Sequence, residues 1–445
     1  MPFVLDNEHT LDVAIIGGGI TGAVLAIGLL SRGIKVKVYE RARGFSEVGA
    51  GIGFTPNAEW AMKVVDPRIH QAFKNVASRN STDWFSWINS YGGDDGTIKT
   101  PHDELIYNMY LGERGFEGCH RAQFLDELAK LIPAECAEFR KNLSTIEDHG
   151  QDEKLVIKFQ DGTTAQADIV IGCDGIRSRV RQLVLGEDNP ASYPGYTHKY
   201  ALRGLIPMEK AVPVLGEEKT GSRFMHLGDG AHALTFPVAD GKLLNVVAFV
   251  SDPDEWPDQH KMTGSCTKQD ALHAFKNFAP ATRGIIDLLP ERLDKWAIFD
   301  TCDNPAPTYF NGRLCLAGDA AHASSPHHGA GAGMGIEDVA ALATLLELAQ
   351  SEMQKKTHSK IDLIHHAFAG YDRIRVKRSH WLVETSRYVG ELYEWQHGRD
   401  PARIRREIDW RARKIWSYNI DEMNRQAREE FMRRLALGAR NYILG

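Results

Sequence analysis

The apolar positions near the N-terminus group into short blocks. Val13–Ile16 is an unbroken apolar and mostly β-branched run, typical of a strand buried on both faces of a parallel sheet. Ala23–Leu30 is a helix-forming stretch, and Lys35–Tyr39 reads as a second strand that ends at Glu40. The order strand, helix, strand predicts one βαβ unit.

Further apolar runs recur along the chain. Ala167–Gly172 predicts another buried strand, which ends in Asp174-Gly175, and Arg313–Ala317 predicts one that ends in Gly318-Asp319. A hairpin before the first of them turns at Asp161-Gly162. The middle of the chain supplies runs that suit an antiparallel sheet: Tyr200–Ile206, Arg223–His226, Ala231–Val238 and Leu243–Val250. A long helix is predicted to begin near Ile336.

Glycines mark the first turn. Gly17, Gly19 and Gly22 have the G-x-G-x-x-G spacing that lets backbone approach a pyrophosphate at a helix N-terminus. Glu40, eighteen residues after Gly22, is where such a unit places the acid that binds a ribose hydroxyl. An acid there disfavours a 2′-phosphate, so FAD or NAD is expected rather than NADP. The alternative is that the glycines serve only helix-on-sheet packing.

Bulk properties narrow the class of protein. The chain has 445 residues, a net charge of −6, 43% hydrophobic and 25% charged residues, as in an ordinary soluble protein of two or three domains. No general attraction to nucleic acid is expected. Val13–Leu30 is interrupted by glycines and preceded by acids, so we expect neither a signal peptide nor a membrane span. Six cysteines without a C-x-x-C pair favour a reducing compartment, the cytoplasm, and no metal site.

The C-terminal stretch 401–440 is basic, with eleven Lys or Arg against six Asp or Glu. Such a stretch suits either a nucleic-acid-binding arm or an amphipathic helix with a solvated basic face. Recurrent apolar residues favour the helix: Ile404, Ile408, Ile415, Phe431 and Leu435.

Three motifs occur in a fixed order: the glycine fingerprint, Cys173-Asp-Gly175 and Gly318-Asp319. From Asp12 to about Tyr393 the chain resembles the single-component FAD-dependent aromatic hydroxylases, in their salicylate hydroxylase-like branch. Within that branch it looks similar to fungal hydroxylases that dearomatise polyketide-derived resorcyl aldehydes and ketones. The resemblance implies an α/β fold: a Rossmann-like FAD-binding domain, an inserted substrate domain with a mixed or antiparallel sheet, and C-terminal helices.

The resemblance also implies domain boundaries and cofactor contacts. The FAD-binding domain would comprise 1–75, 115–180 and 295–350, the substrate domain 76–114 and 181–294, and the helical region 355–445. Tightly bound FAD would be held by Gly17, Gly19, Gly22, Glu40, Gly53, Arg121, Asp319, Pro326, Gly331 and Ala332. Amides at Gly331 and Ala332 would face the flavin N1 and O2, where reduced flavin carries negative charge. For Asp319 a helix-capping role and for Arg121 a solvated position were the alternatives.

The implied reaction uses NAD(P)H as a transient co-substrate and O₂, and it oxygenates an electron-rich ring through a C4a-hydroperoxyflavin. A fixed cation near the phenol oxygen would favour the phenolate, and Arg203, within an apolar strand, is our candidate catalytic residue. A buried salt bridge to an acid such as Asp229 was the alternative. The second phenolate contact stays open, because Phe236 stands where related enzymes present a tyrosine. The candidates are His327, which ranks first, His232, His226, Tyr107 and Tyr110.

Other classes of flavin or nicotinamide enzyme share parts of this pattern. A flavin-dependent halogenase needs a W-x-W-x-I-P element that the sequence lacks, and a NAD-linked dehydrogenase leaves Gly318-Asp319 unexplained. A simple ring hydroxylase, a non-hydroxylating FAD oxidoreductase and a flavoprotein sensor stay open. The sequence does not identify the phenol that is oxidised or the nicotinamide cofactor, NADH or NADPH, that is preferred. It also does not distinguish a monomer from a homodimer.

Overall fold

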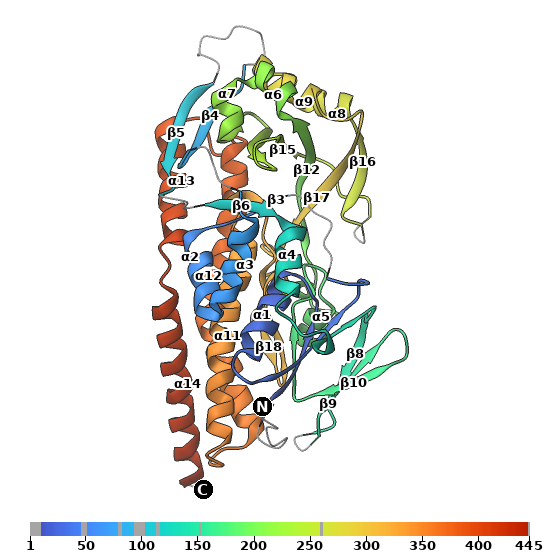
Figure 1. Cartoon of the computed structure of the whole chain (residues 1–445), viewed down its shortest axis with the longest axis vertical. Coiled ribbons are helices and arrows are strands. Elements are labelled where there is room, and N and C mark those ends of the chain that lie inside the picture. Colours follow the sequence, from blue (N-terminus) through green and yellow to red (C-terminus); the bar gives the residue numbers. More distant parts are fainter. Residues whose placement is uncertain are drawn as a thin grey trace.

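The computed structural model describes residues 10–45, 51–78, 82–92, 103–112, 116–150, 153–258 and 261–443, with side chains to residue 437. Its lower half in Figure 1 is built on a six-stranded sheet in which all neighbours are parallel except the edge pair β18 and β19. In spatial order the strands are β18 (Phe310–Asn311), β19 (Leu314–Leu316), β11 (Ile169–Gly172), β1 (Asp12–Ile16), β2 (Lys35–Glu40) and β7 (Ala137–Phe139). This sheet confirms the predicted βαβ unit, with α1 (Ile20–Leu30) as its crossover helix.

The upper half is an eight-stranded mixed sheet (Figure 1). In spatial order its strands are β16 (Thr263–Thr267), β17 (Arg292–Asp300), β12 (Gly195–Pro207), β15 (Leu243–Ser251), β14 (Ala231–Val238), β13 (Arg223–Leu227), β4 (Trp84–Asn89) and β5 (Glu104–Tyr110). All neighbours are antiparallel except β13 and β4. The boundary expected at 295 falls inside β17, which pairs with β12 and β16, so this strand belongs to the substrate sheet up to Asp300.

Smaller elements complete both halves. The strands are β3 (Gly51–Phe54) with β6 (Glu117–His120), and β8 (Leu143–Glu147), β9 (Leu155–Phe159) and β10 (Thr164–Ala167), the last two forming the predicted hairpin. The helices are α2 (Pro56–Val65), α3 (Pro67–Val76), α4 (Arg121–Ala129), α5 (Arg179–Leu185), α6 (Met208–Leu215), α7 (Glu217–Gly221), α8 (Lys268–Ala274), α9 (Pro280–Asp287) and α10 (Asp319–His322). Single turns are η1 (Ala134–Cys136), η2 (Pro190–Ser192) and η3 (Pro326–His328).

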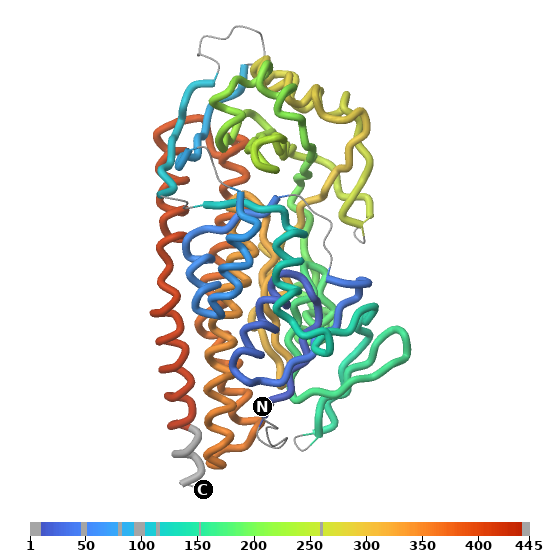
Figure 2. Tube along the Cα trace, in the orientation of Figure 1, coloured from blue at the N-terminus to red at the C-terminus, as the bar shows by residue number. Residues whose placement is uncertain are grey.

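Four helices form the C-terminal part of the chain. They are α11 (Gly331–Met353), α12 (Lys360–Tyr393), α13 (Pro401–Trp416) and α14 (Ile420–Ile443). The trace in Figure 2 shows α12 running from the lower half into the upper one, and α11 packs between α1, α2, α12 and α14. The long helix therefore begins five residues before the predicted Ile336, because three glycines form its first turns where they pack closely on neighbours.

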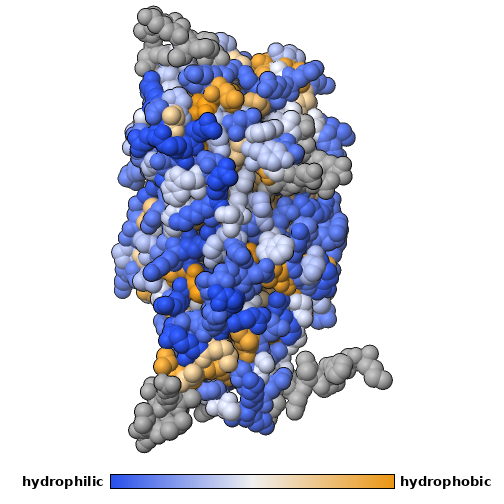
Figure 3. All heavy atoms as spheres, turned by 90° about the vertical axis from the view of Figure 1, so that its left-hand side faces the viewer, coloured by the Kyte–Doolittle hydropathy of each residue, from blue (hydrophilic) through white to orange (hydrophobic). Residues whose placement is uncertain are grey.

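The basic C-terminal stretch forms two amphipathic helices rather than one. Their apolar residues Ile404, Ile408, Ile415, Phe431 and Leu435 are buried, as predicted. Figure 3, which looks onto the side of the molecule that carries α13 and α14, shows a mainly hydrophilic surface with scattered apolar patches. Among the described residues no helix is long and apolar enough to cross a membrane.

Candidate active site

The first glycine turn has the geometry of a phosphate cradle. Gly17 lies at φ +104°, and a Cβ there would be 2.4 Å from the Cys173 carbonyl oxygen. A Cβ on Gly22 would lie 2.0 Å from the Gly17 carbonyl oxygen. Only glycine fits either position, and the bare backbone leaves the N-terminus of α1 open to an anion.

Glu40 lies beside this turn at the end of β2. Its carboxylate accepts hydrogen bonds from the Gly18 N–H at 2.6 Å and the Ala42 N–H at 2.7 Å. These bonds hold the carboxylate next to the phosphate turn, where a ribose hydroxyl would meet it, as the sequence predicts.

Thr21 joins the two glycine motifs that lie three hundred residues apart. A Cβ on Gly318 would lie 2.6 Å from the Thr21 hydroxyl oxygen, and one on Gly335 would lie 2.5 Å from it. The turn after β19 and the start of α11 therefore pack directly on Thr21 of α1, because Gly318 and Gly335 have no side chains. A single ligand can thus touch both motifs.

Asp319 follows Gly318 at the start of α10 and is exposed. Gly331 lies close to Asp319, because a Cβ on Gly331 would be 4.0 Å from the Asp319 Oδ1. The Met334 N–H donates to the carbonyl of Ala330, the residue before α11, so the amides of Gly331 and Ala332 precede the helical ladder. The carboxylate of Asp319, which could bind sugar hydroxyls, and the amides of Gly331 and Ala332, which could bind the anionic edge of a ring, therefore lie close together.

These donors and acceptors fit FAD. The α1 cradle suits the pyrophosphate, Glu40 the adenosine ribose, Asp319 the ribityl hydroxyls, and the α11 amides the flavin N1 and O2. Arg121 is the first residue of α4, as predicted, and is half-buried. Gly53 in β3 packs under Phe116, whose ring a Cβ would approach to 2.5 Å. Gly49 and Ala50 of the same predicted segment lie outside the described residues.

A network of buried charged side chains stabilises the turn that contains Gly318 and Asp319. Asp338 of α11 accepts from the Gly318 N–H at 2.9 Å and pairs with His322 Nε2 at 2.5 Å. Arg375 of α12 donates to Asp338 at 2.8 Å and to Glu337 at 2.7 Å, and all four side chains have no exposed surface. The neighbouring cations hold the pKa of Asp338 below its usual range although burial opposes this. The network therefore fixes the loop that carries Asp319.

Arg203 projects from the inner face of the substrate sheet among apolar side chains. Val247 of β15 lies opposite Arg203, and Leu234 of β14 lies opposite Val247, so the three form one row. The guanidinium carbon is 5.6 Å from the ring centre of Trp296. The buried Arg203 Nε has no hydrogen-bond partner within the described part of the chain. Burial, reinforced by the nearby Arg121, lowers the pKa of Arg203.

The alternative pairing of Arg203 with Asp229 is wrong. Asp229 instead accepts from Arg399 at 2.8 Å at the surface. Asp229 therefore does not neutralise Arg203.

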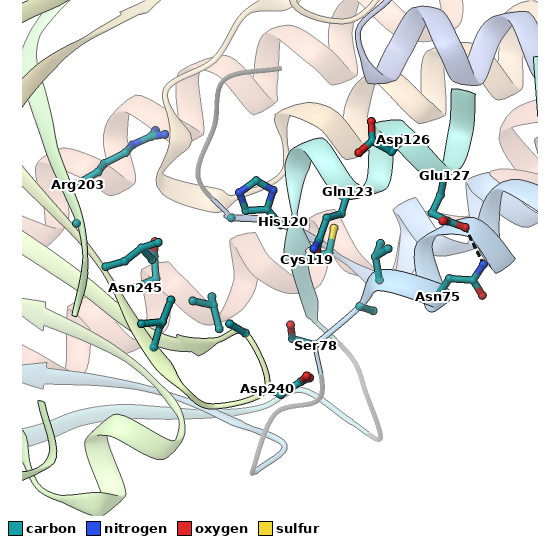
Figure 4. Close-up of a pocket in the computed structure, with 18 of the residues that line it drawn as sticks. Asn75, Ser78, Cys119, His120, Gln123, Asp126, Glu127, Arg203, Asp240 and Asn245 are labelled. Atoms are coloured by element: carbon teal, nitrogen blue, oxygen red, sulfur yellow. Dashed lines mark hydrogen bonds between the residues drawn. The ribbon is translucent and has the colours of Figure 1, made fainter. Parts of the chain in front are cut away.

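An open groove of about 890 Å³ leads to Arg203. Figure 4 shows it between α4 and the preceding strand on one side, which contribute His120 and Gln123, and the substrate sheet on the other, which contributes Arg203 and Asn245. Asp126, Glu127 and Lys130 lie toward the far end of α4. The groove thus connects the surface with the junction of the two halves.

The candidate substrate contacts occupy different environments. His327 and His232 are buried, their ring centres are 5.2 Å apart, and His327 follows Pro326 in η3. Phe236 is half-buried, and its ring lies 3.3 Å from the position of a Cβ on Gly51. Both histidines and Phe236 therefore lie where the substrate sheet meets the FAD-binding half.

The remaining candidates have other roles. His226 is buried between Ser90 and Thr235, at 3.2 and 3.0 Å. Tyr107 donates to Asp409 at 2.5 Å, and burial together with this bond raises its pKa to about 12. Tyr110 is 55% exposed on the edge strand β5. These three residues are structural or superficial.

Sequence reasoning missed the apolar row and the acid beneath the histidines. Val247 and Leu234 were read only as strand residues, although the alternation along β14 and β15 already assigns them to the face of Arg203. Glu394 at the end of α12 accepts from His232 Nδ1 at 3.1 Å, and nothing in the local sequence marks it.

A Rossmann-like sheet with two glycine-marked helix starts, joined to a second sheet that carries Arg203 at an open groove, is typical of a flavin-dependent oxygenase. The family described as "FAD binding domain" matches residues 10–360. The chain belongs to this family of FAD-dependent monooxygenases, and FAD is its cofactor.

Individual relatives agree with this assignment. The FAD-dependent monooxygenase pigN of Monascus ruber is 57% identical over 438 residues, which cover 98% of this chain and all of the relative. The salicylate hydroxylase asL1 of Sarocladium schorii is 43% identical over 95% of this chain and 92% of its own. A solved salicylate hydroxylase substrate complex superposes with a TM-score of 0.81 at 32% identity, over 95% of this chain and 98% of the other. The predicted fold class and enzyme class are confirmed.

Proposed function

We propose that this monooxygenase uses NAD(P)H and O₂ to hydroxylate an ionised phenol, either salicylate-like or a polyketide-derived resorcyl aldehyde or ketone, with or without loss of aromaticity. The buried, unpaired Arg203 Nε in an apolar surround is the observation that carries the proposal. A phenolate oxygen supplies the charge and the acceptor that this guanidinium lacks. The names of the relatives, a salicylate hydroxylase among them, support the same substrate class.

When bound, FAD supplies the activation of O₂ and the transfer of one oxygen atom. The chain's own residues orient and protect the reacting ring. Arg203 holds the phenol oxygen in its ionised form, which raises the electron density of the ring carbons. Val247, Leu234 and Phe249 exclude water on the same face, which favours oxygen transfer over loss of the oxidant to solvent.

We assign the groove beside α4 as the access route for the reductant and the substrate. The chain has one dinucleotide fingerprint, which FAD occupies, so the nicotinamide needs an open site from which it can leave. The groove is open to solvent and reaches Arg203. Six free cysteine thiols support a reducing, cytoplasmic location as part of this proposal.

The test is Arg203→Ala in the FAD-loaded enzyme. We expect FAD content to be unchanged and hydroxylated product to fall at least a hundredfold, because one buried charge-assisted contact in the transition state contributes about 3 kcal/mol. Lys295→Met is the matched control: Lys295 faces the opposite side of the sheet, beside the Tyr200 ring at 4.1 Å. Product is measured by mass spectrometry with a panel of salicylates and alkylated resorcyl aldehydes. Product at the wild-type rate in Arg203→Ala would remove Arg203 from the mechanism, and NAD(P)H oxidation that no phenol stimulates would favour a sensor.

A further inference from the structure

The groove that contains Arg203 has two chemically different walls. The α4 wall carries polar and charged side chains, among them Gln123, Asp126 and Glu127 (Figure 4). The wall formed by the substrate sheet carries the large apolar side chains of Leu205 and Leu243. The proposed reaction uses the arginine of this groove but gives its apolar wall no role.

Leu205 is exposed although it lies within strand β12, two positions after Arg203. Side chains two positions apart on a strand extend from the same face of the sheet, so both residues face the groove. Gly204 between them faces the other way, because a Cβ there would lie 2.4 Å from Leu289 Cδ2. Leu205 is 54% exposed, so a bound apolar group could cover it and gain free energy by doing so.

The register of the strands continues this apolar wall outward from Arg203. Leu205 lies opposite Asn245 of β15, and Leu243, two positions before Asn245, lies one row further out, opposite Val238 of β14. Leu243 and Val238 are half-buried and line the groove. The row of Leu243 is four residues from that of Arg203, roughly 14 Å along the strands. Leu205, Leu243 and Val238 therefore form an apolar strip between Arg203 and the mouth of the groove.

The open space beside Arg203 lies on the outer side of its row. The next row inward contains Ala201 and Phe249, which are 1% and 5% exposed. A substituent on a ring held by Arg203 therefore has room toward the mouth, along the apolar strip. Among the described residues that line the groove, none is an assigned FAD contact, so bound FAD leaves this space accessible.

The mouth of the groove is acidic. Asp126 of α4 and Asp240, in the turn between β14 and β15, are both exposed there. Glu127 is nearby, but Lys130 and the Asn75 side-chain amide, at 2.9 Å, already bind its carboxylate. The two exposed carboxylates repel a further anion, so a chain that reaches the mouth should not end in a carboxylate.

We propose that the apolar strip binds an uncharged side chain of several carbon atoms carried by the phenolic ring, while Arg203 holds the ring oxygen. This inference rests on the proposed function and deepens it, since it selects phenols with an extended apolar side chain over salicylate, which has none. Leu205 and Leu243 are specificity-determining residues, because they would touch the chain and not the reacting ring carbon. The polar α4 wall stays available to the nicotinamide.

The test measures how binding to the oxidised holoenzyme depends on chain length. The probes are 2,4-dihydroxybenzaldehydes that carry a methyl, propyl, pentyl or heptyl group at C6, and the change in flavin absorbance reports their binding. Each added carbon should tighten binding about twofold, half of what complete burial gives, because only one wall is apolar; the whole series then spans roughly sixtyfold. A carboxylate at the end of the heptyl chain should cancel most of this gain.

Variants of the strip should change the dependence on chain length rather than binding in general. Leu205→Thr keeps a residue that suits a strand, and it should leave the methyl probe unchanged while weakening the heptyl probe about tenfold. Adding Leu243→Thr should make all four affinities nearly equal. The matched control is Leu105→Thr on β5, which is 56% exposed and does not line the groove, and it should leave the series unchanged. Arg203→Ala should weaken every probe by the same factor.

Two patterns would overturn the inference: equal affinity of the wild type for all four probes, or weakening of all four by one factor in Leu205→Thr. A raised KM for NAD(P)H in Leu205→Thr with an unchanged probe series would assign the strip to the reductant and overturn it as well. Tight binding of the carboxylate probe would exclude the mouth as the position of the chain end. Binding needs no turnover, so the expected series without any hydroxylated product would reject the proposed function alone.

Discussion

Arg375 offers a direct test of the network behind the flavin loop. Arg375→Met replaces a buried cation by an uncharged side chain of similar length. Asp338 then keeps His322 and the Gly318 N–H as partners, and Glu337 keeps Arg378 and Asn57. Two carboxylates then share less positive charge in a site without solvent. Breaking such a pair from one side costs about 3–5 kcal/mol.

The loss should appear in both stability and cofactor retention. At roughly 2–4 °C per kcal/mol, the unfolding midpoint is expected to fall on the order of 10 °C. Because Asp338 also holds the Gly318 amide, FAD should be released at a lower temperature, which flavin fluorescence reports during heating. The matched control is Arg373→Met on the same helix: the Arg373 side chain is 66% exposed and its Nε lies 3.6 Å from Glu430 Oε2, so its loss should cost under about 0.5 kcal/mol.

A double variant separates charge from packing. Adding Asp338→Asn to Arg375→Met removes the uncompensated negative charge and should recover part of the lost stability. Equal unfolding temperatures for Arg375→Met and Arg373→Met would refute the electrostatic reasoning. Absence of any recovery in the double variant would assign the loss to packing instead.

Three further outcomes are expected. Gly22→Ala should abolish FAD retention in the purified protein, whereas Gly44→Ala, where a Cβ meets nothing within 4 Å, should keep the yellow colour. Asp319→Ala should weaken FAD binding about tenfold in a titration of apoprotein, through loss of one or two hydrogen bonds to hydroxyls. Burial lowers the pKa of His226 to about 4 and that of His328 to about 3. Below pH 6.5 the unfolded chain therefore binds more protons than the folded one, so the free energy of unfolding should fall as the pH drops from 6.5 toward 4. His226 alone should account for about 3 kcal/mol of this fall, which denaturant titrations at each pH would measure.

The elements that were correctly predicted from the sequence are those whose structure is determined by neighbouring residues in the chain. The strand before Gly17, the turn, the helix after it and the acid at Glu40 all lie within thirty residues, and each follows from residue type and spacing. The start of α11 was placed too late because glycine has a low helix propensity. Its glycines are set by contacts with Thr21 and Ala58, which belong to distant segments.

Arg203 shows where prediction from one sequence ends. An arginine inside an apolar strand needs a partner for its charge, and this local argument makes Arg203 a candidate. Its partner depends on what the fold brings to the same face, and the proposed acid, Asp229, is instead taken by Arg399. Another acid, Glu394, lies close to the same sheet, but it is paired with Lys199 and His232. Both acids are therefore already paired with other cations, Asp229 with Arg399 and Glu394 with Lys199, and these pairings join residues far apart in the sequence, so the strand around Arg203 could not reveal them.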